Sequence, residues 1–217
     1  AADVLAESPD VVIIATGGEP NTTFLQAGAD LVVTSWDILG GYAQPAANVL
    51  LFDDNGQHQS LSCAEFIAEK GAKLELVSPD RMIAQEIGGT NYPAYLRAFY
   101  EKGVTMTLNH RLTAVHRSGN KLIAGLYNEY SKCSVERTVD QVVIEHGTLP
   151  IDELYFDLKA GSSNLGEVDL DALIAGQPQT LVNNPAGTYQ LFRVGDAVAG
   201  RNIHAAIYDS LRLCKDI

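Results

Sequence analysis

The chain lacks most of the short motifs that mark a ligand site in a sequence. Its 217 residues contain no G-x-G-x-x-G fingerprint, no C-x-x-C pair, no H-E-x-x-H helix and no G-x-S-x-G elbow. Without G-x-G-x-x-G we expect no ordinary dinucleotide-binding loop. Without C-x-x-C and H-E-x-x-H we expect no iron–sulfur or zinc site built from local motifs. The last removes an α/β-hydrolase nucleophile. We therefore expect no metal site and no catalytic residue within this chain.

Cysteines and long apolar runs are also scarce. The three cysteines, Cys63, Cys133 and Cys214, are odd in number and far apart, which favours buried free thiols in a reducing, cytoplasmic setting. A run of ~18 apolar residues, which a membrane-spanning helix needs, is missing, and no signal peptide is visible. The chain begins with Ala1 and not with methionine, so we expect it to be a piece of a longer protein.

Positive charge is in short supply. Fifteen Lys and Arg residues face 27 Asp and Glu residues, which gives a formal net charge of −12. Nucleic-acid binding depends on Lys and Arg that neutralise phosphates, so the composition excludes nucleic acid as a partner. With 46% hydrophobic residues, the chain can bury a core as one large domain or two small ones.

The last segment carries the most informative pattern. A strand is predicted at Leu191–Val194, followed by a sharp turn at Gly195-Asp196 and a long apolar helix. Glycine lets a ligand approach the backbone, a carboxylate can accept from a ribose hydroxyl, and a helix N-terminus offers free N–H groups to a phosphate. Asp196 could instead cap the helix. Arg201 could reach a phosphate, while Asn202 and His204 would hold the loop, and core packing would explain most of the helix over 205–213.

A second glycine pair follows the apolar run Val11–Ala15. That run is typical of a buried parallel strand, and Thr16-Gly17-Gly18 comes directly after it. Ligands bind at the carboxyl ends of strands in open parallel sheets, so these glycines favour a nucleotide site. A tight turn that glycine merely permits is the alternative interpretation.

The middle of the chain, residues 47–148, has the pattern of a separate Rossmann-like unit. Alternating apolar residues and terminal glycines predict strands at 49–52, 73–77, 105–108 and 140–145, helices at 60–70 and 92–102, and a meander over 111–117, 121–127 and 134–138. Trp36, which precedes this unit, is expected either in a core or against a nucleotide-side loop.

The loop from Asp53 to Ser60 stands where a glycine fingerprint belongs. It keeps only Gly56, is about two residues too long and places two carboxylates, Asp53 and Asp54, beside the position of a pyrophosphate. Negative charges repel a pyrophosphate, so this unit is not expected to bind NADH in the ordinary way. We expect Asp53 and Asp54 to lie in a solvated loop rather than to bind a metal.

Taken in order, the segments VVIIATGGEP, TSWDILGG, NVLLFDDNGQHQS, VDQVVIEHGTLP and FRVGDAVAGRNIHAAIYDSLRL resemble the C-terminal region of bacterial NADH:flavin oxidoreductases. The similarity is greatest to the trimethylamine dehydrogenase and dimethylglycine or N-methylproline demethylase branch. It implies an α/β fold of Rossmann-like three-layer domains of the glutathione-reductase type, with an antiparallel β-meander. A partial FAD- or ADP-binding domain would span residues 1–46 and 149–217, without its first βαβ unit. An NAD(P)-binding-like domain with a degenerate loop would span residues 47–148.

The same resemblance implies a flavin-dependent oxidoreductase whose FMN-binding barrel and 4Fe–4S cluster lie outside this chain. The chain alone would be inactive, and an electron-transfer flavoprotein and homo-oligomers are possible partners. Two alternatives stay open: an electron-input region like that of NADPH-dependent 2,4-dienoyl-CoA reductase, and a non-redox scaffold stabilised by ADP. The residues expected to hold FAD or ADP are Ala15, Thr16, Gly17, Gly18, Gly195, Asp196, Ala197, Arg201, Asn202 and Ile203.

Overall fold

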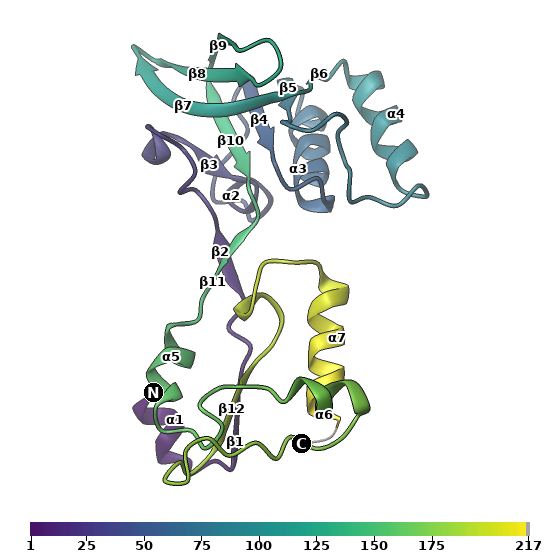
Figure 1. Ribbon diagram of the computed structural model, residues 1–217. Helices are drawn as coiled ribbons and strands as arrows, with labels where there is room; N and C mark the ends of the chain where they lie inside the picture. The colour runs from purple at the N-terminus through teal and green to yellow at the C-terminus, as the bar shows by residue number, and fades with distance from the viewer. Residues whose placement is uncertain (216–217) are drawn as a thin grey trace. The chain divides into compact units, whose positions relative to one another are not determined.

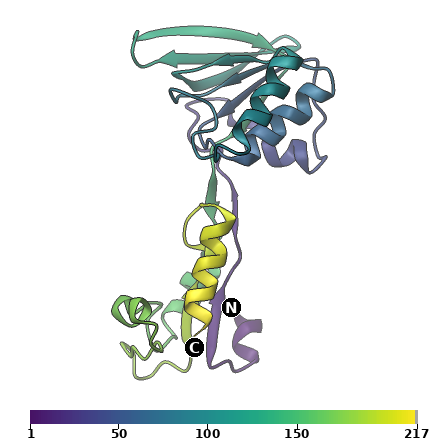
Figure 2. The ribbon, with the colours of Figure 1, turned by 90° about the vertical axis from the view of Figure 1, so that its right-hand side faces the viewer.

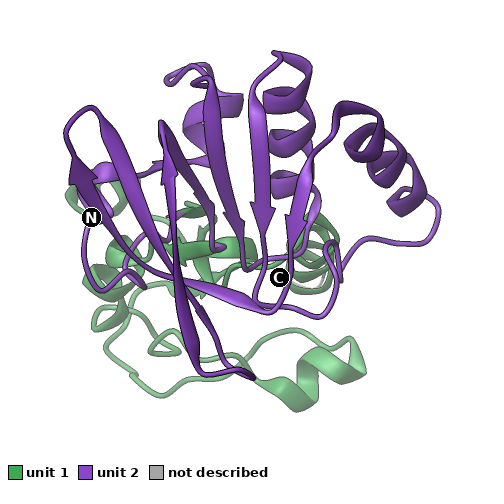
Figure 3. Cartoon of the chain, turned by 90° about the horizontal axis from the view of Figure 1, so that it is seen from above, with its two compact units in different colours: residues 1–19, 148–217 green, residues 20–147 purple. Residues whose placement is uncertain are grey.

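The computed structural model describes residues 1–215 and divides the chain into two units, coloured separately in Figure 3. Unit 1 comprises residues 1–19 and 148–217, and unit 2 comprises residues 20–147. The expected division placed residues 20–46 with unit 1, but the structure groups them with unit 2. The reason is long-range pairing, because β3 (Val33–Thr34) joins the sheet of unit 2 beside β10 (Gln141–Glu145).

Unit 2 contains a five-stranded parallel sheet with the order β3-β10-β4-β5-β6. The other members of this sheet are β4 (Asn48–Asp53), β5 (Lys73–Val77) and β6 (Thr105–Thr107). An antiparallel meander of β7 (His110–Ser118), β8 (Lys121–Asn128) and β9 (Cys133–Val139) follows. The helices of this unit are η1 (Ala29–Leu31), α2 (Ser35–Leu39), α3 (His58–Glu69) and α4 (Tyr92–Lys102).

Alternation along β4 builds two cores in unit 2, one on each face of the parallel sheet. Val49 and Leu51 pack with side chains of α3 and with Phe99 of α4. Leu50 and Phe52 point to the other face and pack with side chains of the meander. Since successive side chains of a strand point to opposite faces, one buried strand serves both layers. Helices α2, α3 and α4 accordingly lie on one face of the sheet and the meander on the other (Figures 1 and 2).

Helices α3 and α4 end where glycines adopt left-handed backbone angles. Gly71 has φ +84° after α3, and Gly103 has φ +68° after α4. Such angles cost little without a Cβ atom, so glycine favours the end of a helix at these positions. The predicted elements of this unit are observed with shifts of two residues or fewer at their ends.

Unit 1 is built on two parallel strands, β1 (Val11–Ile14) and β12 (Gln190–Arg193). Residues of β1 and β12 pack with Tyr155 and Leu158 of α5 in one core, and Phe192 and Val194 pack with Leu213 in a second. The remaining elements are α1 (Ala2–Ala6), α5 (Glu153–Lys159), α6 (Leu170–Ala175), η2 (Gly195–Ala197), α7 (Ile203–Cys214) and the paired strands β2 (Gly18–Pro20) and β11 (Thr148–Pro150).

Two expectations about burial are wrong. Trp36 is 45% exposed and therefore not a core residue, because α2 buries only Ser35 and Ile38. Of the three free cysteines only Cys63 is buried, whereas Cys133 and Cys214 are exposed. Within residues 1–215, no helix is both long enough and apolar enough to cross a bilayer.

Candidate nucleotide-binding site

The two glycine segments predicted from the sequence meet at one edge of unit 1. Strands β1 and β12 run parallel, with Ile14 in register with Arg193, and Val194 N donates to Ile14 O at 3.0 Å. Residues 15–17 and 195–197 therefore leave the same end of the strand pair side by side. This is the carboxyl end of both strands, where open α/β sheets bind ligands.

On the β1 side, the backbone of Gly17 is accessible. Gly17 has φ +76°, and a Cβ built on it would meet no atom within 4 Å. The segment is fixed from behind, because Ile151 N donates to Gly17 O at 3.0 Å and the Thr16 hydroxyl donates to Ile151 O. Ala15 and Thr16 are exposed. A ligand can thus lie against the backbone at 15–17 without displacing a side chain.

Gly18 has a structural role in addition to the binding role expected for it. A Cβ on Gly18 would lie 2.8 Å from Leu149 O, so glycine is needed here for the pairing of β2 with β11. Its open neighbour Gly17 is the better candidate for contact with a ligand.

On the β12 side, Gly195 and Asp196 form a tight turn. Gly195 has φ +62°, and a Cβ on it would lie 3.2 Å from Ala206 Cβ, so α7 packs directly against this glycine. Ala197 is buried. The half-buried Asp196 accepts from Arg201 N through Oδ1 at 3.2 Å. The second carboxylate oxygen of Asp196 is available to accept from a ligand hydroxyl.

The alternative interpretation, in which Asp196 caps the long helix, is wrong. The turn forms the short helix η2, and α7 begins only at Ile203. Asn202 is the capping residue of α7, and its side chain accepts from Ala205 N at 2.9 Å. Asp196 is therefore not the N-cap, because five residues separate η2 from α7.

The loop between η2 and α7 is held by an ion pair. The Arg201 guanidinium pairs with Asp209 on α7, and Gly195 N donates to Asp209 Oδ2 at 3.3 Å. Arg201 is thus engaged within unit 1 and would have to leave Asp209 to reach a phosphate. Ile203 is 71% exposed, and the exposed His204 makes no side-chain hydrogen bond within residues 1–215, contrary to the structural role expected for it.

Helix α7 exposes most of its apolar side chains, so the expectation of core packing is wrong. Ile207 is 60%, Tyr208 57% and Leu211 63% exposed, and Leu213 is the buried residue of the helix. The reason is that the unit 1 sheet has only the two strands β1 and β12 within the described chain, so one face of α7 has no layer to cover it.

In unit 2, Asp53 is buried in the loop after β4, contrary to the expectation of a solvated position. Asp53 is 1% exposed, and Oδ1 accepts from Gly56 N at 2.9 Å and from Asn55 N at 3.0 Å. Burial raises the pKa of Asp53 from 3.8 to about 6, and the negative charge of Glu145 adds to this effect. Asp54 forms an ion pair with Arg111 at 3.1 Å. No group of three or more metal-binding side chains was found in the described part of the chain.

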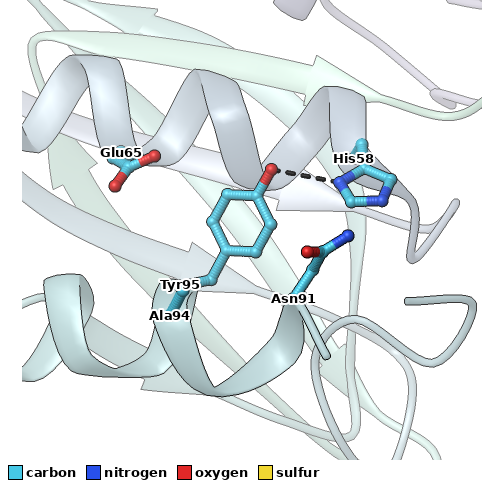
Figure 4. Close-up of a pocket in the computed structure, with 5 residues that line it drawn as sticks. All are labelled: His58, Glu65, Asn91, Ala94 and Tyr95. Atoms are coloured by element: carbon cyan, nitrogen blue, oxygen red, sulfur yellow. Dashed lines mark hydrogen bonds between the residues drawn. The ribbon is translucent and has the colours of Figure 1, made fainter. Parts of the chain in front are cut away.

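Sequence reasoning missed two features of unit 2. Glu145 is 4% exposed, and it accepts from Ser35 Oγ and from Gly147 N. A pocket of about 330 Å³ lies between α3 and α4, lined by His58, Glu65, Asn91, Ala94 and Tyr95. Figure 4 shows the Tyr95 ring between the two helices, with its hydroxyl 3.1 Å from His58 Nδ1. No sequence motif marks this pocket, because its lining comes from two separate helices.

Known structures share this fold. Histamine dehydrogenase from Rhizobium sp. 4-9 superposes with a TM-score of 0.75 at 22% identity, over 97% of this chain and 29% of its own. The flavoprotein disulfide reductase RclA from Escherichia coli gives a TM-score of 0.60 at 17% identity, over 92% of this chain and 42% of its own. The expected α/β fold of the glutathione-reductase type is confirmed.

Sequence relatives are much more similar. The chain is 56% identical over 214 residues to a protein of Rhizobium meliloti (strain 1021) named "Probable N-methylproline demethylase". The matched region covers 99% of this chain and 32% of that protein. It is 46% identical over 219 residues to N,N-dimethylglycine/sarcosine dehydrogenase of Chromohalobacter salexigens, with 96% of this chain and 32% of that protein covered. A scan of family models found no match.

The chain spans about a third of the length of these curated relatives. Its relatives by sequence are oxidoreductases, a demethylase and a dehydrogenase, and this confirms the expected resemblance. The chain is therefore similar to one region, about a third, of proteins named as an N-methylproline demethylase and an N,N-dimethylglycine/sarcosine dehydrogenase.

Proposed function

We propose that unit 1 holds an adenine nucleotide, FAD or ADP, at the shared carboxyl end of β1 and β12. The observation that carries this proposal is the meeting of the open backbone at Gly17 with the turn at Gly195-Asp196. Glycine backbone at a strand end admits the flat face or the phosphates of a nucleotide, and the free Asp196 oxygen can accept from a sugar hydroxyl. The other proposed contacts are Ala15, Thr16, Gly18, Ala197, Arg201, Asn202 and Ile203.

The whole protein is proposed to be a cytoplasmic flavin-dependent enzyme that oxidises an N-methylated amino acid, the class that the names of its relatives indicate. FMN and a 4Fe–4S cluster would lie outside this chain, where FMN would supply the oxidising chemistry. This region would then bind nucleotide without carrying out catalysis. An electron-transfer flavoprotein is the proposed acceptor, and unit 2 would be an NAD(P)-binding-like domain that does not bind NADH in the ordinary way.

Two alternatives make different demands on the same protein. A reductase of the 2,4-dienoyl-CoA type would require NADPH to reduce FAD in unit 1, and the carboxylate-filled loop after β4 speaks against it. A scaffold would require ADP in place of FAD. The nucleotide released from the purified protein separates redox use from the scaffold, since FAD supports redox use and ADP alone supports the scaffold. Bleaching of the flavin absorbance by NADPH supports the reductase.

Asp196→Ala in the full-length protein tests the proposed contact. Loss of a hydrogen bond to a charged acceptor costs roughly 2 kcal/mol, so ADP affinity should fall about 30-fold in equilibrium binding. Asp157→Ala, which removes an exposed aspartate from α5, is the matched control and should leave affinity unchanged. Equal affinity in wild type and Asp196→Ala would exclude Asp196 from the site.

A further inference from the structure

The loop after β4 in unit 2 contains an anion supplied by the chain itself. Asp53 ends β4 and Glu145 ends β10, and the two residues are register partners on adjacent parallel strands. They therefore stand at the carboxyl edge of the sheet and before α3, which is the place where a dinucleotide phosphate binds in this class of fold.

The N–H groups that would face such a phosphate are already paired. Asp53 Oδ1 accepts from the backbone N–H groups of Asn55 and Gly56 at 3.0 and 2.9 Å. Glu145 Oε1 accepts from Gly147 N at 3.1 Å and from Asn55 Nδ2 at 3.2 Å. Asp53 thus accepts two backbone N–H groups of the kind that a glycine-rich loop offers to a pyrophosphate, and Glu145 holds the side chain of Asn55 in the same loop.

The outside of the loop is covered as well. Glu86 N donates to Gly56 O at 3.1 Å, and a Cβ on Gly56 would lie 3.3 Å from Gln85 N. Ile83 and Ala84 in the same segment are 3% and 2% exposed. Asp53 Oδ2 has no hydrogen-bond partner among residues 1–215. The carboxyl group is therefore buried inside the unit and has almost no contact with solvent.

We propose that the Asp53 carboxyl group, which accepts from the Asn55 and Gly56 N–H groups beside Glu145, takes the place of a dinucleotide phosphate. It thereby prevents dinucleotides from binding to unit 2. The position of this oxygen matters in addition to its charge. Asp53→Asn keeps an acceptor for the two N–H groups, whereas Asp53→Gly removes it. The inference concerns unit 2 alone and does not depend on which nucleotide unit 1 holds.

Amide hydrogen exchange of the full-length protein with and without about 1 mM NADH, the upper end of ordinary KM values, tests this directly. In the wild type, NADH should leave exchange at residues 54–60 unchanged. In Asp53→Gly the same amides should exchange faster without ligand and become protected by NADH at least threefold. Asp53→Asn should behave like the wild type. The matched control Asp54→Asn, which removes one negative charge from the same loop, should also show no NADH effect.

Each outcome decides the proposal. Protection at 54–60 by NADH in the wild type would overturn it without reference to any variant. Equal protection in Asp54→Asn and Asp53→Gly would show that net charge, and not the seated oxygen, excludes the dinucleotide. A folded Asp53→Gly protein, judged by circular dichroism, whose exchange at 54–60 ignores NADH would show that Asp53 does not close the loop. If Asp53→Gly does not fold, the wild type together with Asp53→Asn still tests the proposal, because NADH protection in either one contradicts it.

Discussion

The side chain of Asn164 pairs with both backbone polar groups of Leu191 on β12. Asn164 Nδ2 donates to Leu191 O at 2.9 Å, and Asn164 Oδ1 accepts from Leu191 N at 2.9 Å. Asn164 is 1% exposed. A single amide thus makes the two hydrogen bonds that a neighbouring strand would make, and it closes the edge of β12 opposite β1.

Asn164→Ala should therefore destabilise unit 1 strongly. It leaves a buried N–H group and a buried carbonyl without partners, at about 1–3 kcal/mol each, so we expect a loss of roughly 3 kcal/mol. Hydrogen exchange at the Leu191 amide measures this loss. Asn183→Ala removes an exposed hydrogen bond to Glu167 and should cost less than about 0.5 kcal/mol. Similar values for the two variants would contradict the edge-closing role of Asn164.

Unit 2 should lose stability as pH rises. The pKa of Asp53 is about 6 in the folded protein against an ordinary value of 3.8. The folded state therefore binds the proton more tightly, and this contribution is complete below pH 3.8 and is lost as pH rises through 6. The loss amounts to roughly 3 kcal/mol at pH 7.

Asp53→Asn removes that titration while keeping an acceptor on the loop. Its free energy of unfolding, measured by urea titration with Trp36 fluorescence, should rise relative to that of the wild type as the pH increases from 4 to 7. Asp54→Asn, which removes one charge from the same loop but keeps Asp53, is the matched control. A constant difference between Asp53→Asn and the wild type would mean that Asp53 titrates normally.

The two glycines of the candidate site should respond differently to alanine. Gly17→Ala meets open space and bears only the strain of φ +76°, about 1 kcal/mol, so its main effect should be on nucleotide affinity. Gly195→Ala adds a contact of 3.2 Å with Ala206 Cβ to a similar strain and should cost about 2 kcal/mol or more. Thermal unfolding and ADP titration of both variants separate the effects. Equal losses of stability would show that α7 does not pack tightly on Gly195.

Helix α7 offers a contrast between two leucines. Leu213 is 6% exposed and packs with Phe192 and Val194, so Leu213→Ala should cost about 2–3 kcal/mol. Leu211 is 63% exposed, so Leu211→Ala should cost less than about 0.5 kcal/mol in this chain. Urea unfolding of both variants measures the difference. If Leu211→Ala lowers the stability of the full-length protein strongly but that of this chain little, another part of the full-length protein covers this face.

Most of unit 2 could be predicted because its signals are local. The alternation in β4, the helical spacing in α3 and the glycines at 71 and 103 each fix an element without reference to distant residues. The burial of Asp53 could not be predicted in this way. It depends on Glu145 from a strand some ninety residues later and on the covering segment near Ala84.

The sequence predicts the position of the candidate site in unit 1 more accurately than the roles of its single residues. Strand periodicity and glycines predicted the segments at 15–18 and 195–197, and the pairing of β1 with β12 brings the two together. The alternative of Asp196 as the helix cap is wrong although Asp196 and Asn202 are both good capping residues in sequence, because only the tertiary structure selects Asn202. The same holds for residues 20–46, whose place in unit 2 depends on β3 pairing with β10.

The most direct test of the central claim is the adenine nucleotide content of the full-length protein. Wild type and Asp196→Ala would be purified, denatured and analysed for released FAD, ADP and FMN. The account predicts about one adenine nucleotide per chain in the wild type and a substantial loss of it in Asp196→Ala, with FMN content unchanged. A wild type that releases no adenine nucleotide, or an Asp196→Ala protein that retains all of it, would contradict the proposed site in unit 1.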